Sequence, residues 1–464
     1  MKRWVKGGLA AGGAAVAAGA LRRYLNPEPR YSPWEKRPYG EFEKKVLVVG
    51  GGFGGYAVTE KLTEMTRARD DVGVMMISRE NFFTFWPMVA GTISSDIDTL
   101  NVAQPLRRAL ITAGASFRRA ALRHIDYERR VAVAEGGKEF SYEHLVLAVG
   151  AQPNFFGIEG VAEHCLTMKG IADAERIRNR VIERFEDATL ADGDVPASSL
   201  TFAVIGGGST GVETAAEIDA LITDALAPDY PGIRRDRVKV ILLTRGKEIL
   251  PELDPALRRA ARARLAARNV EVLTNAAAER VEADRVILKD GREIETENAI
   301  WTAGGRPNEL LKDLDLPLTE RDGVIVDEYL RVADRPGLWS LGDCAAVPNV
   351  LAENEKERYV PPTAQAAVQE GYVAAENVLA SLDGREEDLK PFEYRPMGHL
   401  VELGSEFAVN EVLGVRFSGL LAALVWRATY LYKLESPRGK AQVATDWILG
   451  LFFRPAAAEI RRDG

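Results

Sequence analysis

The residues with the clearest chemical potential are glycines that follow a run of β-forming residues near the start of the chain. Gly50, Gly52 and Gly55 have the spacing G-x-G-x-x-G and directly follow the apolar residues 46–49. In such a turn the first glycine permits a tight bend and the second lets a pyrophosphate approach the backbone. The third lets the next helix pack on the strand. Because the positive end of that helix faces the phosphates, the spacing predicts a dinucleotide-binding turn.

The same arrangement occurs a second time, where residues 202–205 lead into Gly206, Gly208 and Gly211. One motif of this kind is a weak signal, since glycine-rich turns are common. Two copies in the same strand–turn–helix context favour two nucleotide sites. Two dinucleotide sites in one chain are typical of an enzyme that holds a flavin and receives a nicotinamide dinucleotide. The alternative is a pair of ordinary α/β turns.

The residues at the end of the second strand of each unit bear on ribose recognition. A carboxylate is expected there, roughly 20 residues after the glycines. Instead, the first unit has Ser78 and Arg79, and the second has Thr244 and Arg245. A serine binds ribose hydroxyls more weakly than an acid does, and an arginine can pair with the 2′-phosphate of NADPH. The choice between NADH and NADPH is therefore open.

Polar side chains in the last third of the chain provide further candidates. Asp343 follows a short apolar strand, where a carboxylate can bind the ribityl hydroxyls of a flavin. Gln365 and Gln369 lie one turn apart on a helix predicted over residues 364–379, with Thr363 as its N-cap. Their amides could hold the carbonyl groups of a flat ligand. On spacing alone, an ordinary alanine-rich helix fits equally well.

The overall composition excludes several classes of function. The 464 residues are 46% hydrophobic and 28% charged, as in a soluble globular protein, and the net charge of −8 argues against nucleic acid as a partner. Cys165 and Cys344 form no C-x-x-C pair, so dithiol chemistry is not expected. The four histidines are scattered, and we expect no metal site.

The order of the motifs predicts an α/β protein with two Rossmann-like dinucleotide-binding domains, the second inserted in the first. A helix is predicted over residues 173–189 with Asp173 as its N-cap, and Asp290-Gly291 predicts a hairpin turn. The predicted segments are a leader and linker (1–40), the first part of the flavin domain (41–160), the nicotinamide domain (161–305), the second part of the flavin domain (306–400) and a C-terminal segment (401–464).

Both ends of the chain have features of membrane contact. Residues 1–40 begin with a basic, Gly/Ala-rich stretch that imitates a signal peptide; we favour a retained leader, with a cleaved signal as the alternative. Residues 420–432 and 447–453 are apolar and aromatic with basic flanks, which is typical of helices in a bilayer interface. A dimer interface is the competing interpretation. The side chains concerned are Trp426, Tyr430, Tyr432, Trp447, Phe452 and Phe453, fringed by Arg427, Lys433, Arg438, Lys440 and Arg454.

Together these motifs resemble those of the type II NADH dehydrogenases, which are single-chain NADH:quinone oxidoreductases that do not pump protons. The matching segments are VLVVGGGFGG, LVLAVGAQPNFFGIEG, FAVIGGGSTGVETAAE, AIWTAGGRPN, LGDCA, PPTAQAAVQEG and ATDWILGLFFRP. The similarity covers roughly residues 44–455, which is nearly the whole fold.

The resemblance implies bound FAD, NADH or NADPH at the second domain, a membrane quinone as acceptor and a peripheral location on the cytoplasmic face of the cell membrane. It assigns Gly50, Gly52, Gly55 and Asp343 to FAD, and Gly206, Gly208 and Gly211 to the nicotinamide dinucleotide. Further matched cofactor-binding residues are Phe53, Gly54, Ser78, Arg79, Gly150, Thr244, Arg245, Gly304, Gly342, Ala364 and Gln365. Glu213 matches a glutamate beside nicotinamide and flavin, and Gln365 and Gln369 match the quinone-site motif. The strand-end residues depart from the family's usual acids.

Three other functions remain open at this point. A soluble NADPH-dependent flavin reductase would keep the glycines without needing the aromatic tail. A sulfide:quinone oxidoreductase-like enzyme would work through paired cysteines near the flavin. A scaffold that kept the fold but lost turnover would tolerate the changed strand ends.

Overall fold

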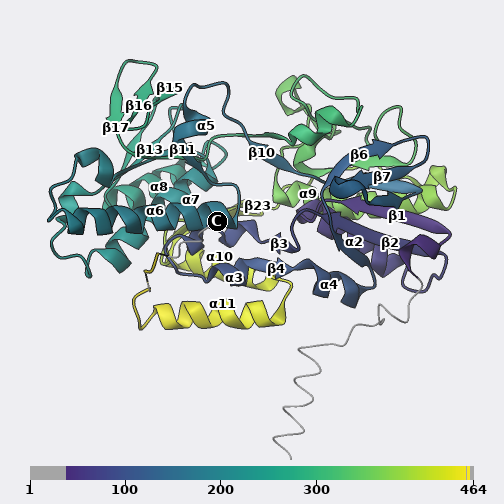
Figure 1. Cartoon of the computed structure of the whole chain (residues 1–464), viewed down its shortest axis with the longest axis horizontal. Helices are drawn as coiled ribbons and strands as arrows, with labels where there is room; N and C mark the ends of the chain where they lie inside the picture. The colour runs from purple at the N-terminus through teal and green to yellow at the C-terminus, as the bar shows by residue number, and fades with distance from the viewer. Residues whose placement is uncertain (1–37, 456, 460–464) are drawn as a thin grey trace, which may run out of the picture.

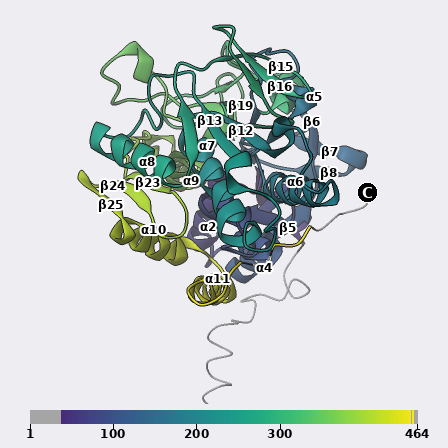
Figure 2. The same cartoon turned by 90° about the vertical axis from the view of Figure 1, so that its left-hand side faces the viewer.

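The computed structural model describes residues 38–455 and 457–459. All but the last three residues of the predicted leader lie outside this range. The described chain forms two α/β units next to each other, and a C-terminal part packs along the lower side of both (Figure 1). The same C-terminal helices lie at the lower edge when the molecule is turned by 90° (Figure 2).

The first unit is built on a five-stranded parallel sheet in the order β21-β9-β1-β2-β5. Its strands are apolar nearly throughout because helices and smaller sheets cover both faces. Strand β21 comes from far along the chain, so the sequence leaves this sheet and later returns to complete it. The strands are β1 (Lys44–Val49), β2 (Val72–Ser78), β5 (Ser116–Arg119), β9 (His144–Leu147) and β21 (Leu338–Ser340).

The second unit repeats this design with a parallel sheet in the order β11-β18-β12-β13-β14. In each sheet the central strand leads into one of the glycine-rich turns. The two predicted Rossmann-like folds are thus both present, and the second lies between the two parts of the first. The strands are β11 (Cys165–Thr167), β12 (Thr201–Ile205), β13 (Lys239–Leu243), β14 (Val270–Leu273) and β18 (Asn298–Trp301).

Two short strands connect the units. β10 (Ala151–Pro153) leads out of the first unit, and β19 (Gly305–Pro307) leads back into it. They pair antiparallel with each other, so the two crossings of the chain run next to one another.

The main helices begin at the glycine turns or at capped positions. α2 (Phe53–Met65) packs closely on α9 (Ala364–Leu382), since a Cβ on Gly371 would lie only 2.8 Å from that of Ala57. Thr363 caps α9 as predicted, by accepting a hydrogen bond from the Ala366 N–H at 3.2 Å. The other helices are α3 (Thr99–Val102), α4 (Leu106–Ala113), α5 (Val161–His164), α6 (Ile171–Leu190), α7 (Ser209–Ala220) and α8 (Pro255–Ala267).

The predicted cap of α6 was wrong. The helix begins at Ile171 after Gly170, and Asp173 lies within its first turn. There the buried carboxylate accepts hydrogen bonds from the Lys169 N–H at 2.6 Å and from the Thr167 hydroxyl at 3.1 Å. An acid in the first turn satisfies free N–H groups much as a cap does, which explains the similar sequence pattern.

Smaller sheets flank the two units. The charged segment 119–144 forms an antiparallel meander, and the hairpin predicted at Asp290-Gly291 joins two antiparallel strands. The strands are β3 (Phe82–Thr84) with β4 (Ala103–Pro105), β6 (Leu122–Asp126), β7 (Val131–Ala134) and β8 (Glu139–Ser141), and β15 (Ala278–Val281), β16 (Arg285–Leu288) and β17 (Glu293–Glu295).

The C-terminal part consists of a three-stranded antiparallel sheet and two helices. These are β23 (Gly398–Glu402), β24 (Ala408–Val412), β25 (Val415–Gly419), α10 (Leu420–Lys433) and α11 (Pro437–Gly450). No helix in the described part of the chain is long and apolar enough to cross a membrane.

Part of the predicted interfacial pattern was wrong, because several of its residues face inward. Trp426 is 2% and Trp447 8% exposed. Arg427 lies beneath the Trp447 ring and forms an ion pair with Asp96 at 3.2 Å. These side chains attach α10 and α11 to the rest of the fold and do not form an outer aromatic and basic face.

Candidate active site

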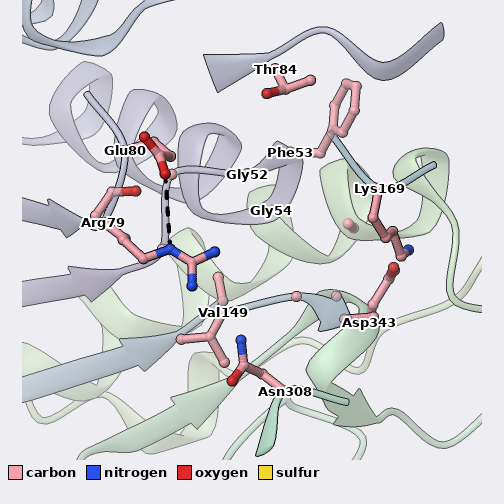
Figure 3. Close-up of a pocket in the computed structure, with 18 of the residues that line it drawn as sticks. Gly52, Phe53, Gly54, Arg79, Glu80, Thr84, Val149, Lys169, Asn308 and Asp343 are labelled. Carbon is pink, nitrogen blue, oxygen red and sulfur yellow. Dashed lines mark ion pairs between the residues drawn. The ribbon is translucent and has the colours of Figure 1, made fainter. Parts of the chain in front are cut away.

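A cavity of about 800 Å³ lies where the two units meet (Figure 3). This volume is at the upper end of the range for small-molecule and cofactor sites. From the first unit it is lined by the turn over residues 50–54, by residues 78–80 at the end of β2 and just beyond it, and by Asp343. From the second unit it is lined by Thr210 and Thr302, so that both glycine-rich units face one space.

The first glycine turn has the geometry that a bound pyrophosphate requires. Gly50 has a φ of +112°, which disfavours any other residue. A Cβ on Gly55 would overlap the carbonyl oxygen of Gly50, so α2 can approach β1 this closely only with glycine there. A Cβ on Gly52 would meet no atom within 4 Å and would stand in the open space at the start of α2. The turn therefore fits FAD.

The predicted flavin ligand Asp343 lies in the same cavity. In Figure 3 its carboxylate points toward the ammonium group of Lys169. Burial raises the pKa of Asp343, and the Lys169 cation opposes that rise. The turn that carries Asp343 is fixed by the buried Glu370, which accepts a hydrogen bond from the Gly342 N–H at 2.6 Å. Burial also raises the pKa of Glu370, to about 7.

Several lining residues were not found from the sequence. Lys169 and Asn308 contribute to the cavity wall, and the Lys169 ammonium lies 5.8 Å from the centre of the ring of Trp86. Trp86 also lines the cavity and belongs to the aromatic segment 81–88, which the sequence did offer as a wall of a flavin pocket. Glu80 also lines the cavity and pairs with Arg79 at 3.9 Å. An acid two residues beyond the strand end was the available signal for a ribose ligand, since β2 ends at Ser78.

The second glycine turn repeats the geometry of the first. Gly206 has a φ of +142°, and a Cβ on Gly211 would overlap the Gly206 carbonyl oxygen. Thr244 is buried beneath this turn, whereas Arg245 is exposed immediately after it. Gly208 precedes α7, where a Cβ would again meet no atom within 4 Å.

The other predicted cofactor-binding residues divide between the cavity and its surroundings. Phe53, Gly54, Gly150, Gly304, Gly342 and Ala364 line the cavity. Gly206, Gly208, Gly211, Thr244 and Arg245 surround the second turn and are not among the lining residues.

The structure places Gln365 and Gln369 against the protein's own backbone. The Gln365 amide donates to the Gly398 carbonyl at 2.6 Å and accepts from the Met397 N–H at 3.0 Å. The Gln369 amide donates to the Arg395 carbonyl at 3.0 Å and accepts from the Arg395 N–H at 3.2 Å. Both side chains thus hold the segment before β23 on α9, and their role toward a quinone stays a prediction.

Glu213 belongs to a cluster of carboxylates between α7, β23 and α10. It lies one turn after the cavity residue Thr210 and accepts a hydrogen bond from the Glu402 N–H at 3.3 Å. Burial raises the pKa of Glu213 and of Glu217 to about 8 each. Glu217 accepts a hydrogen bond from the Ser94 hydroxyl. Glu213 lies beside the cavity and is not one of the residues that line it. The catalytic role predicted for Glu213 therefore stays a prediction.

Comparison with known proteins bears on what this cavity holds. Residues 44–371 match the family described as pyridine nucleotide-disulphide oxidoreductase. The "Probable NADH dehydrogenase" of Dictyostelium discoideum is 30% identical over 88% of this chain and 90% of its own length. The "Type II NADH:quinone oxidoreductase Ndh" of Mycobacterium tuberculosis is also 30% identical, over 87% of each chain.

Solved structures share the fold. NDH2 from Plasmodium falciparum in complex with NADH superposes with a TM-score of 0.80 at 20% identity, over 90% of this chain and 100% of that one. The sulfide:quinone oxidoreductase of Aquifex aeolicus reaches a TM-score of 0.67 at 20% identity, over 90% of this chain and 98% of its own. At these identities the likeness concerns the fold alone.

Two glycine substitutions should separate folding from cofactor binding. Gly55→Ala overlaps the Gly50 carbonyl, so we expect it to destabilise the protein by about 1–3 kcal/mol. Gly52→Ala has space in the fold but obstructs the phosphate site, so it should lower FAD affinity at least about tenfold with little loss of apoprotein stability. Thermal unfolding of the apoprotein and fluorescence titration with FAD measure the two effects. If the two variants lost the same amount of apoprotein stability and of FAD affinity, the assignment of Gly52 to the phosphate site and of Gly55 to helix packing would be contradicted.

Glu217 should make stability depend on pH. Its pKa rises from an ordinary 4.5 to about 8 on folding, chiefly through burial. The folded state therefore holds the proton more tightly, and this stability is complete below about pH 4.5 and lost as the pH rises toward 8.

Glu217→Gln should consequently raise the unfolding temperature at pH 9, by the equivalent of on the order of 1–3 kcal/mol, and change it little at pH 5. The exposed Glu387→Gln serves as the matched control and should change neither value. A Glu217→Gln variant less stable than wild type at pH 9 would show that the carboxylate is needed in its ionised form.

Proposed function

The chain belongs to the pyridine nucleotide-disulphide oxidoreductase family, as one of its type II NADH dehydrogenases, and from this premise we propose that it is an FAD-dependent NAD(P)H:quinone oxidoreductase. The observation that carries the proposal is the cavity that two glycine-rich nucleotide turns share. One turn holds a resident cofactor, and the other receives a second dinucleotide beside it.

Bound FAD would take up a hydride from the nicotinamide and supply the electrons that reduce the quinone. The chain binds and orients the reactants. The N–H groups at the start of α2 would face the pyrophosphate, and the Glu80 carboxylate, which lines the cavity, would accept hydrogen bonds from the hydroxyls of the adenosine ribose. Asp343 would bind hydroxyls of the ribityl chain, and the Lys169 cation, toward which its carboxylate points, would partly offset the effect of burial on that carboxylate.

The second unit positions the visiting nicotinamide. Its pyrophosphate fits at Gly208 and the start of α7, by the same geometry as in the first unit. Thr210 and Thr302 then lie between this turn and the shared cavity. A dinucleotide bound in extended form would reach the flavin end of the cavity between these two threonines.

A sulfide:quinone oxidoreductase function is not favoured, although the folds are alike. That chemistry needs paired cysteines, and Cys165 lies in β11 of the second sheet while Cys344 follows β21 of the first. Cys344 is fully buried and its thiol donates to the Leu341 carbonyl at 3.2 Å. Burial raises the pKa of both thiols, which opposes their reaction as thiolates.

We infer that the protein attaches peripherally to the cytoplasmic face of the cell membrane through α10 and α11. On α10, large apolar side chains are exposed at helical spacing, among them Leu420, Leu421 and Leu424. The end of α11 and the residues after it also expose Ile448, Leu449, Leu451, Phe452 and Phe453, and the two groups together are called the apolar face. Lys433, Arg438 and Arg454 are exposed nearby and suit anionic headgroups.

This apolar face also argues against a soluble flavin reductase. Monomeric soluble proteins rarely expose so many neighbouring large apolar residues, whereas a lipid surface or a second copy of the chain would cover them. Attachment to the bilayer would bring the cavity near a quinone dissolved in the lipid.

The two half-reactions test the enzyme directly. We expect the purified protein to be yellow and to release FAD on heating. NADH or NADPH should bleach the flavin, and a quinone should restore its colour. Asp343→Ala should lower the FAD content about tenfold or more, whereas the exposed Asp388→Ala should not. A colourless, folded protein that cannot be reconstituted with FAD would refute the proposal.

Replacing two exposed leucines tests the membrane face. Leu421→Glu with Leu424→Glu should weaken binding to anionic liposomes by at least about tenfold, since each leucine contributes roughly 1.5–3 kcal/mol when buried. Activity with long-tailed quinones should fall more than activity with short soluble ones. Leu190→Glu, at an exposed site on α6, is the control. If liposome binding is unchanged but the oligomer dissociates, the face is a dimer interface.

A further inference from the structure

The two dinucleotide units can be compared position by position, because each has a hydroxyl residue at the end of its second strand. In the first unit, a Cβ on Gly51 would lie 2.9 Å from Ser78 Oγ. In the second, a Cβ on Gly207 would overlap Thr244 Oγ1. Ser78 and Thr244 therefore occupy equivalent places in the two units, next to Gly51 and Gly207.

The residues that follow these hydroxyls differ between the units. After Ser78 come Arg79 and Glu80, and Glu80 lines the flavin cavity. After Thr244 come Arg245 and Gly246, so the second unit has a glycine at the position of Glu80. The unit assigned to FAD, whose adenosine ribose carries no 2′-phosphate, thus has a carboxylate that the other unit lacks.

The nearest acids of the second unit are engaged elsewhere. Glu248 forms an ion pair with Arg262 at 3.7 Å. Glu252 accepts a hydrogen bond from the Ser209 hydroxyl at 2.9 Å, at the start of α7. Neither occupies the position that Glu80 has in the first unit.

Two cations on this loop are available instead. Arg245 and Lys247 are exposed, and neither forms a hydrogen bond or ion pair with another residue in the described part of the chain. The loop beneath them is held in place. Thr244 Oγ1 accepts from the Gly246 N–H at 3.3 Å, and the Gly246 carbonyl accepts from the Asn275 N–H at 2.9 Å.

We propose that Arg245 and Lys247 bind the 2′-phosphate of NADPH and that this enzyme prefers NADPH to NADH. A guanidinium can form paired charge-assisted hydrogen bonds with a phosphate, and a nearby ammonium adds a second cation. The absence of a carboxylate at Gly246 matters as much, because an acid at that position would repel the 2′-phosphate of NADPH. The assignment rests on the proposed function only in taking the second unit as the nicotinamide site.

Direct binding tests this without turnover. Adenosine 2′,5′-bisphosphate and AMP differ only in the 2′-phosphate, and calorimetric titration of the FAD-loaded protein compares them. We expect the bisphosphate to bind about tenfold to hundredfold more tightly at low salt, with the difference shrinking as ionic strength rises. Arg245→Ala with Lys247→Ala should abolish the difference. Arg259→Ala removes an exposed cation from α8 of the same unit and should leave it intact.

A reciprocal substitution tests the comparison of the two units. Gly246 has ordinary backbone angles, and a Cβ there would lie no closer than 3.4 Å to the Glu248 carbonyl oxygen, so a side chain fits. Gly246→Glu should restore the carboxylate that Glu80 provides in the first unit. We expect the ratio of kcat/KM for NADPH to that for NADH to fall at least about tenfold.

The results separate this proposal from the function on which it rests. Equal binding of the two adenosine phosphates, or a nucleotide preference unchanged by both sets of substitutions, would overturn it. A protein that is reduced by NADH but not by NADPH would overturn it while leaving the proposed function in place. Failure of both nucleotides to reduce the flavin would refute the enzyme function, and the bisphosphate titration would still decide the phosphate site.

Discussion

The fold depends on how closely a strand and a helix can approach across a turn of glycines. At Gly55 and again at Gly211 the helix backbone lies against the carbonyl oxygen of the glycine that ends the strand, leaving no room for a side chain. This contact fixes the direction of α2 and α7, and so points the N–H groups of each helix into the space where the units meet. The remaining strands, helices and small sheets hold these two turns opposite each other.

The parts that the sequence predicted well are those where the backbone itself is the functional group. Gly50, Gly52 and Gly55 were recognisable because a tight turn and close packing exclude other residue types. The inserted arrangement of the second unit followed from the order of the two motifs and was confirmed by the pairing of β21 with β9. Thr363 was found because a capping hydroxyl acts within its own turn.

Contacts between residues that are far apart in the sequence were not predictable from the sequence alone. Lys169 precedes α6, and only the fold brings it against Asp343. The amides of Gln365 and Gln369 lie on the expected helix, but local spacing does not show that they bond to residues 395–398. Arg427 lies in a sequence typical of a membrane flank, yet its guanidinium is drawn inward by ion pairs with Asp96 at 3.2 Å and Glu402 at 3.7 Å.

The antiparallel pairing of β10 with β19 has a consequence for how such a protein can change over evolutionary time. Because the chain leaves the first unit and re-enters it at adjacent positions, the two ends of the intervening unit lie next to each other. A replacement unit with the same two ends would keep the path of the host chain, a situation in which domain insertion is tolerated, and it would also need the residues that pair with Ser94 and Glu402. The electron donor can thereby be exchanged by recombination while the first glycine turn and Asp343 are inherited unchanged.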